Sequence, residues 1–126
     1  TGGKERIMFV DDEEKILKIA HAVLTKYDYK VTICPNGVQA LQEFEKEQDQ
    51  FSLIITDMTM PHMNGIELIE RILGLRPHIP IILCSGYSEL ISKEKIDIMG
   101  INYFQKPIVM SELVRTVRKI LDRAPI

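Results

Sequence analysis

Short apolar runs alternate along the chain with longer segments whose apolar residues recur at helical spacing. The first run, residues 6–10, is rich in strand-forming residues and stops at the acidic stretch 11–14. Similar strand-like runs occupy residues 31–34, 51–56, 79–84 and 101–104. The pattern therefore predicts five β-strands.

A helix is expected after each strand. Residues 13–26 carry the first helical stripe, and Val38, Leu41 and Phe44 begin a second one after the turn signal Pro35-Asn36-Gly37. Further helices are predicted at residues 66–73, at residues 88–99, and across a final stripe. The first stripe is Ile16, Ile19, Ala20, Val23 and Leu24, and the final one is Leu113, Val114, Val117, Ile120 and Leu121.

This alternation predicts an α/β fold. Parallel neighbouring strands need crossover connections, and helices in those connections cover both faces of the sheet. Five βα units account for the whole chain of 126 residues, of which 45% are hydrophobic. We therefore expect one domain, a three-layer α/β/α sandwich built around a five-stranded parallel sheet.

Composition narrows the possible partners. Sixteen basic against eighteen acidic residues give a formal charge of −2, which does not favour direct nucleic-acid binding. The apolar runs are far shorter than the roughly 20 residues that span a bilayer, and no secretory signal opens the sequence. We expect a cytoplasmic domain that does not insert into membranes.

The cysteines and histidines show no metal-binding spacing. Cys34 and Cys84 lie in apolar, strand-like runs and are predicted to be small core residues. His21, His62 and His78 share no ligand spacing, so a zinc site or a histidine phosphotransfer role has little support.

Polar side chains stand where the predicted strands end. Asp11 and Asp12 follow the first strand, Asp57 the third and Ser85 the fourth, and the fifth runs into Lys106. In open parallel sheets, ligands bind at this carboxyl edge. Two carboxylates about 4 Å apart repel by roughly 4 kcal/mol at an effective dielectric near 20, so three of them require cations or raised pKa values. One lysine and one divalent ion would offset the charge, and oxygen ligands suit Mg²⁺.

Such a site would make Asp57 a credible nucleophile for a phosphoryl group, with Lys106 and Ser85 engaging the phosphoryl oxygens. Each residue also has a plainer interpretation. Asp11 and Asp12 could cap a helix, Lys106 could lie on the surface, and Tyr103 could be an ordinary strand aromatic. The order and placement of the set at successive strand ends favour the functional interpretation.

Five short motifs together resemble the response-regulator receiver family over nearly the whole chain. They are Val10-Asp11-Asp12-Glu13, Ile54-Ile55-Thr56-Asp57-Met58, Met60-Pro61 with Asn64-Gly65, Ser85-Gly86, and Lys106-Pro107. The resemblance implies a flavodoxin-like fold with strand order 2-1-3-4-5. Residues 1–5 would be a lead-in, residues 6–123 a single receiver domain, and residues 124–126 a tail.

The resemblance also implies roles at the site. Asp57 would accept a phosphoryl group from the phosphohistidine of a histidine kinase or histidine phosphotransfer domain. Asp12 and Asp57 would bind Mg²⁺ directly, Asp11 through a water molecule, and Thr59 through its backbone carbonyl. Lys106 would precede a cis proline.

Two more residues would form a conformational switch. The resemblance implies that Ser85 moves toward the phosphoryl group and that the aromatic ring of Tyr103 follows. The surface formed by residues 88–104 would then repack and be recognised by a partner. The domain would be a self-phosphorylating switch, either a single-domain regulator or part of a larger protein such as a hybrid histidine kinase. The cognate kinase and the oligomeric state stay open.

Three other functions share part of this pattern. A haloacid-dehalogenase-like hydrolase also uses an aspartate after an apolar strand, but on its first strand and with an acid two residues later, where this chain has Thr59. A flavin-binding module of the same topology would meet an acidic first loop, which repels phosphate unless a metal intervenes. A degenerate receiver that only binds partners would normally lack part of the phosphate site.

Overall fold

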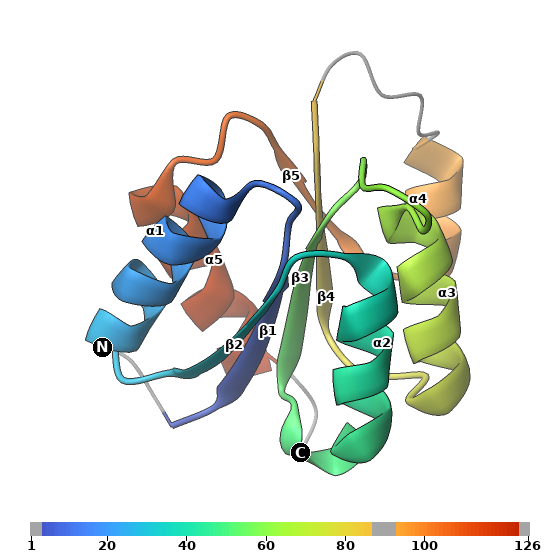
Figure 1. Ribbon diagram of the computed structural model, residues 1–126, viewed down its shortest axis with the longest axis horizontal. Helices are drawn as coiled ribbons and strands as arrows, with labels where there is room; N and C mark the ends of the chain where they lie inside the picture. Colours follow the sequence, from blue (N-terminus) through green and yellow to red (C-terminus); the bar gives the residue numbers. More distant parts are fainter. Residues whose placement is uncertain (1–3, 87–92, 124–126) are drawn as a thin grey trace.

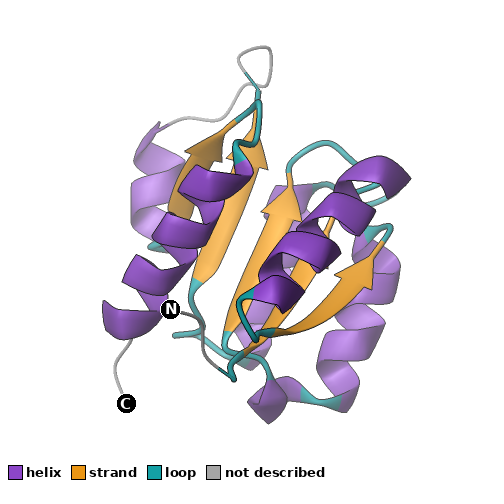
Figure 2. Ribbon diagram, turned by 90° about the vertical axis from the view of Figure 1, so that its left-hand side faces the viewer, coloured by secondary structure: helices purple, strands orange, loops and turns teal. Residues whose placement is uncertain are grey.

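The fold is a five-stranded parallel sheet with the strand order β2-β1-β3-β4-β5. The computed structural model describes residues 4–86 and 93–123. Figure 2 shows the strands side by side with their arrowheads at the same end. The predicted topology is confirmed. The strands are β1 (Arg6–Val10), β2 (Lys30–Cys34), β3 (Leu53–Asp57), β4 (Ile81–Ser85) and β5 (Asn102–Gln105).

Helices cover both faces of this sheet. Figure 1 shows α1 and α5 on one side, and α2, α3 and α4 on the other. The bounds are α1 (Glu14–Lys26), α2 (Gly37–Lys46), α3 (Gly65–Leu75), α4 (Lys93–Met99) and α5 (Met110–Arg123), with a short 3-10 turn at Gln48–Gln50. The fourth helix was predicted at residues 88–99, and residues 88–92 of that prediction lie outside the described residues. In the described part, no helix has the length and apolar character needed to cross a bilayer.

Two hydrophobic clusters form the core, one on each face of the sheet. Successive strand residues point to opposite faces, so Met8 packs with the α2 and α3 side while Ile7 packs with α1 and α5. Every residue of β3 and β4 is buried, as expected for central strands of a covered parallel sheet. Cys34 and Cys84 are free, buried thiols of this core, which confirms their predicted role.

The predicted helical stripes were wrong in detail for α1 and α2. Ile19 is 48% exposed and Val38 43% exposed, although both belong to the apolar stripes predicted from helical spacing. The residues that α1 buries are Leu17, Ala20 and Leu24. Apolar residues occur in adjacent pairs along α1, so two helical frames fit the pattern equally well, and only packing against the sheet selects between them.

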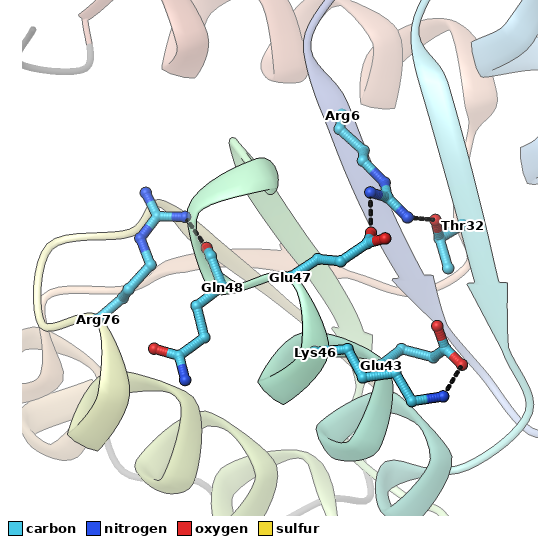
Figure 3. Close-up of polar contacts among 7 residues, drawn as sticks. All are labelled: Arg6, Thr32, Glu43, Lys46, Glu47, Gln48 and Arg76. Carbon is cyan, nitrogen blue, oxygen red and sulfur yellow. Dashed lines mark hydrogen bonds and ion pairs between the residues drawn. The ribbon is translucent and has the colours of Figure 1, made fainter.

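Two arginines anchor the connection between α2 and β3 at the amino end of the sheet (Figure 3). Arg6 pairs with Glu47, and its guanidinium lies 4.5 Å from the centre of the Phe51 ring. Arg76 donates to the carbonyl oxygens of Gln48 (2.6 Å) and Phe51 (2.5 Å). These contacts fix the start of β3, whose other end carries Asp57.

An ion pair joins the start of β1 to α5. Arg118 lies 2.8 Å from the Glu5 carboxylate and 2.9 Å from that of Asp122, and it donates to the Tyr29 hydroxyl at 3.2 Å. The hydrogen bond from Arg118 holds the pKa of Glu5 below its usual value, although partial burial opposes this. Glu5 therefore stabilises the fold in its charged form.

We expect Glu5→Gln to lower the free energy of unfolding by about 0.5–1 kcal/mol at pH 7. Because the pKa of Glu5 is lowered by folding, its contribution is present above the ordinary carboxyl pKa and is lost as the pH falls through the lowered value. Urea unfolding at a series of pH values from 7 downward measures the difference. The matched control is Glu14→Gln, which removes an exposed pair with Lys18 (3.1 Å) and should change stability less. Equal losses for the two variants would contradict the assignment.

Candidate functional site

Three carboxylates meet at the carboxyl edge of the sheet. Asp57 is the last residue of β3, and Asp11 and Asp12 directly follow β1. Val10 and Thr56 are partners in the parallel pairing of β1 with β3, so Asp11 and Asp57 continue the same register. One oxygen from each of the three carboxylates lies within 4.8 Å of the others. Asp11 and Asp57 are buried, at 1% and 3% exposure, whereas Asp12 is exposed.

Lys106 supplies the positive charge that faces this cluster. Its Nζ lies 2.5 Å from Oδ1 of Asp57. The residue directly follows β5, and its backbone N–H donates to the carbonyl oxygen of Ser85 at 2.9 Å. The Lys106-Pro107 peptide bond is cis, as the resemblance implied. The ends of β3, β4 and β5 thus converge on one site.

Ser85 is fully buried at the end of β4, and its hydroxyl donates to the carbonyl oxygen of Gly86 at 3.2 Å. The Tyr103 hydroxyl donates to the Ser85 carbonyl at 3.4 Å, and the Tyr103 side chain is 43% exposed. The ring therefore lies partly in solvent and is not packed in the core.

Thr59, the remaining predicted site residue, is exposed in the loop that follows β3.

Burial and the closeness of like charges make it energetically costly to keep all three carboxylates ionised. Desolvation raises the pKa of Asp11 from 3.8 to about 6, and the nearby Asp57 carboxylate raises it as well. A hydrogen bond from the Glu13 backbone N–H to Oδ1 of Asp11 (2.9 Å) and the charge of Lys106 oppose this shift. Three acidic groups against one ammonium leave the site short of positive charge.

The donor atoms fit a hard divalent cation. All three side chains offer carboxylate oxygens, and one of them is open to solvent, which leaves room for water ligands. Oxygen ligands of this kind suit Mg²⁺ better than they suit zinc or copper. The buried negative charge is itself the reason that such an ion would bind here.

Two residues that hydrogen-bond to the backbone of Asp57 and Met58 have no role predicted from the sequence. The buried Thr56 hydroxyl donates to the Asp57 carbonyl oxygen at 3.0 Å. The Gly65 N–H donates to the Met58 carbonyl oxygen at 2.8 Å and so closes the loop after β3. The capping box between Asn64 and Glu67 marks Gly65 as the first residue of α3, and that Asn-x-x-Glu spacing is a readable sequence signal.

Comparison with known proteins places these features in a family. Residues 7–118 match the response regulator receiver domain. The chain is 32% identical over 118 residues to sporulation initiation phosphotransferase F of Bacillus subtilis, covering 93% of this chain and 94% of that protein. It is 35% identical over 123 residues, 94% of this chain, to the 3',5'-cyclic-nucleotide phosphodiesterase regA of Dictyostelium discoideum, of which it spans 16%. It spans 21% of the two-component response regulator ARR11 of Arabidopsis thaliana.

Solved structures of receiver domains have the same fold as this chain. A CheY-like receiver domain protein from Methanospirillum hungatei superposes with a TM-score of 0.88 at 30% identity, with 97% of each chain covered. A receiver domain protein from Clostridium thermocellum shares the fold with the same TM-score at 24% identity, covering 94% of this chain and 95% of that one. The fold, the site and these matches lead to one conclusion: the chain belongs to the response regulator receiver domain family of two-component systems.

Proposed function

We propose that Asp57 is the residue that takes the phosphoryl group. Receiver domains interact with histidine kinases or phosphotransfer proteins, and they bind Mg²⁺ at an acidic pocket. The observation that carries the proposal is the position of Asp57, a buried carboxylate that lies beside both Asp11 and Asp12 and 2.5 Å from Lys106. The similarity to a sporulation phosphotransferase along 94% of that protein also supports a role in phosphoryl transfer.

In the proposed reaction, a carboxylate oxygen of Asp57 attacks the phosphorus of a phosphohistidine. The new bond is an acyl phosphate, and the phosphorus–nitrogen bond of the donor breaks, with its electron pair left on the imidazole, which takes up a proton. Lys106 and the Ser85 hydroxyl bind the phosphoryl oxygens. Asp11, Asp12, Asp57 and the Thr59 carbonyl would hold Mg²⁺, which when bound offsets the negative charge that the phosphoryl group brings.

Phosphorylation would act as a switch through Ser85 and Tyr103. The Ser85 carbonyl accepts hydrogen bonds from both the Lys106 backbone N–H and the Tyr103 hydroxyl. A movement of Ser85 toward a phosphoryl group on Asp57 would therefore change the position of Tyr103. Tyr103 and the 84% exposed Ile98 lie in residues 93–104, the described part of the segment that we propose a partner recognises, and residues 88–92 of that segment lie outside the described residues.

Removing Mg²⁺ tests this function. The chain is incubated with acetyl phosphate in the presence of Mg²⁺, then with a chelator in excess, then with Mg²⁺ restored, and the intact mass is followed over time. We expect one phosphoryl adduct with Mg²⁺, formation at least about tenfold slower with the chelator, and full recovery on restoration. An unmodified chain under all conditions would instead support a receiver that only binds partners.

A further inference from the structure

Gly65 stands at a close approach between α3 and the end of β3. It is buried, and it is the first residue of α3, directly after the cap formed by Asn64. Its N–H donates to the Met58 carbonyl oxygen at 2.8 Å, and the Met58 N–H donates to the Cys84 carbonyl oxygen at 2.9 Å. The backbone that follows Asp57 is therefore held between α3 and β4.

No space remains for a side chain at this position. A β-carbon at Gly65 would overlap the Asp57 carbonyl oxygen, and it would lie 2.9 Å from Leu83 Cδ1 and 3.0 Å from Met58 Cα. Two of these three neighbours are backbone atoms, which cannot turn away as a flexible side chain can. Gly65 does not have the left-handed backbone angle that Gly100 has, so space and not conformation requires glycine here.

Other glycines in the described part of the chain have no backbone atoms so close to the position of a β-carbon. At Gly37, the nearest atoms to an added β-carbon belong to the flexible Met63 side chain, at 3.1–3.2 Å. At Gly74, in the same helix as Gly65, nothing lies within 4 Å. Among these glycines, Gly65 alone has backbone atoms too close to allow a β-carbon, and those atoms belong to Asp57 and Met58.

We infer that Gly65 is a positioning residue for phosphoryl transfer, because its missing side chain lets α3 press the Asp57–Met58 backbone into the place where the Asp57 carboxylate meets Asp11, Asp12 and Lys106. This inference rests on the proposed role of Asp57. A shift of the Asp57 main chain would move the carboxylate away from Lys106 and would move Thr59, two residues on. Gly65 touches none of the reacting atoms and acts only through the backbone of Asp57 and Met58.

The test compares Gly65→Ala with Gly74→Ala in the same helix. Rates of adduct formation with acetyl phosphate are measured at saturating Mg²⁺, and the affinity for Mg²⁺ is measured separately by chemical-shift titration. We expect Gly65→Ala to react about 10-fold to 100-fold more slowly even when saturated with Mg²⁺, since misplacement by about 1 Å has effects of this size. Gly74→Ala should react at the wild-type rate and unfold at the same or a higher temperature.

A second variant with a weakened core, away from the site, separates an effect on the position of Asp57 from a general loss of stability. Ile120→Val, in the core between α5 and the opposite face of the sheet, should lower thermal stability and leave the saturated rate unchanged. A wild-type saturated rate for Gly65→Ala, or a loss no greater than that of Ile120→Val at equal stability, would overturn the inference while leaving the role of Asp57 intact. A wild-type chain that forms no adduct would instead overturn the proposed function.

The wild-type chain offers a second measurement if Gly65→Ala does not fold. Beryllofluoride with Mg²⁺ binds at phosphoacceptor carboxylates, and amide resonances report the response of the backbone. The Gly65 amide, which donates to Met58, should shift and gain protection from hydrogen exchange, whereas the Gly74 amide should not. An unchanged Gly65 amide beside shifted resonances of Asp57 would overturn the inference.

Discussion

Asp57→Asn is expected to lower the rate of phosphorylation by at least about 1,000-fold, since removal of a nucleophile has effects of this size or greater. The amide of Asn has almost the shape of the carboxylate, but its neutral oxygen is a far weaker nucleophile. It would also withdraw one of the three carboxylates that lie within 4.8 Å of each other. Intact mass after incubation with acetyl phosphate and Mg²⁺ measures the effect.

The control for this variant is Asp49→Asn. Asp49 is an exposed aspartate of the 3-10 turn before β3, at the opposite end of the sheet, so the same chemical change is made away from the site. Asp49→Asn should form the adduct at the wild-type rate. An adduct that survives in Asp57→Asn would show that another carboxylate accepts the phosphoryl group.

Asp11→Asn is expected to raise the metal-free free energy of unfolding by about 1–2 kcal/mol at pH 8. Burial and the Asp57 charge disfavour the ionised Asp11, and Asn retains the oxygen that accepts from the Glu13 N–H. The pKa of Asp11 is raised from 3.8 to about 6 on folding. The destabilisation of the wild type by ionised Asp11 is therefore absent below pH 3.8, grows as the pH rises toward 6, and is complete above pH 6. Urea unfolding in a chelator at pH 4 and pH 8 measures the gain, which should be small at pH 4.

With Mg²⁺ bound, the wild type should become more stable than Asp11→Asn. An ion present at 100 times its dissociation constant stabilises the folded wild type by about 2.7 kcal/mol, and the variant that lacks one carboxylate should gain much less. Asp12→Asn is the matched control, because Asp12 is exposed and its ionised form meets little desolvation. It should lose most of the Mg²⁺ effect without the metal-free gain. A metal-free Asp11→Asn that is no more stable than wild type would contradict the cost assigned to the buried carboxylate.

Much of the fold follows from the sequence because its signals are local. Residues 51–56 form a nearly continuous apolar run, as a strand covered on both faces requires, and β3 indeed occupies Leu53–Asp57. The meeting of Asp11, Asp12 and Asp57 follows from the same reasoning, since parallel strands end at one edge. The strand order follows only from the family resemblance, because hydrophobic periodicity alone does not determine it.

Other features depend on distances between elements that no local pattern contains. The exposure of Ile19 reflects which of two helical frames packs against the sheet. In the sequence, Gly65 belongs to the motif Asn64-Gly65 in a predicted loop, and only its approach to the Asp57 backbone shows why it must be small. The anchoring of β3 by Arg6 and Arg76 likewise joins residues far apart in the chain.

The most direct measurement identifies the phosphorylated residue itself. The chain is phosphorylated with acetyl phosphate and Mg²⁺, the acyl phosphate is reduced with borohydride, and peptide mass spectrometry locates the resulting homoserine. The proposal predicts homoserine at position 57 and at no other aspartate. Homoserine at position 11 or 12, or none at all in a folded chain that binds Mg²⁺, would contradict it.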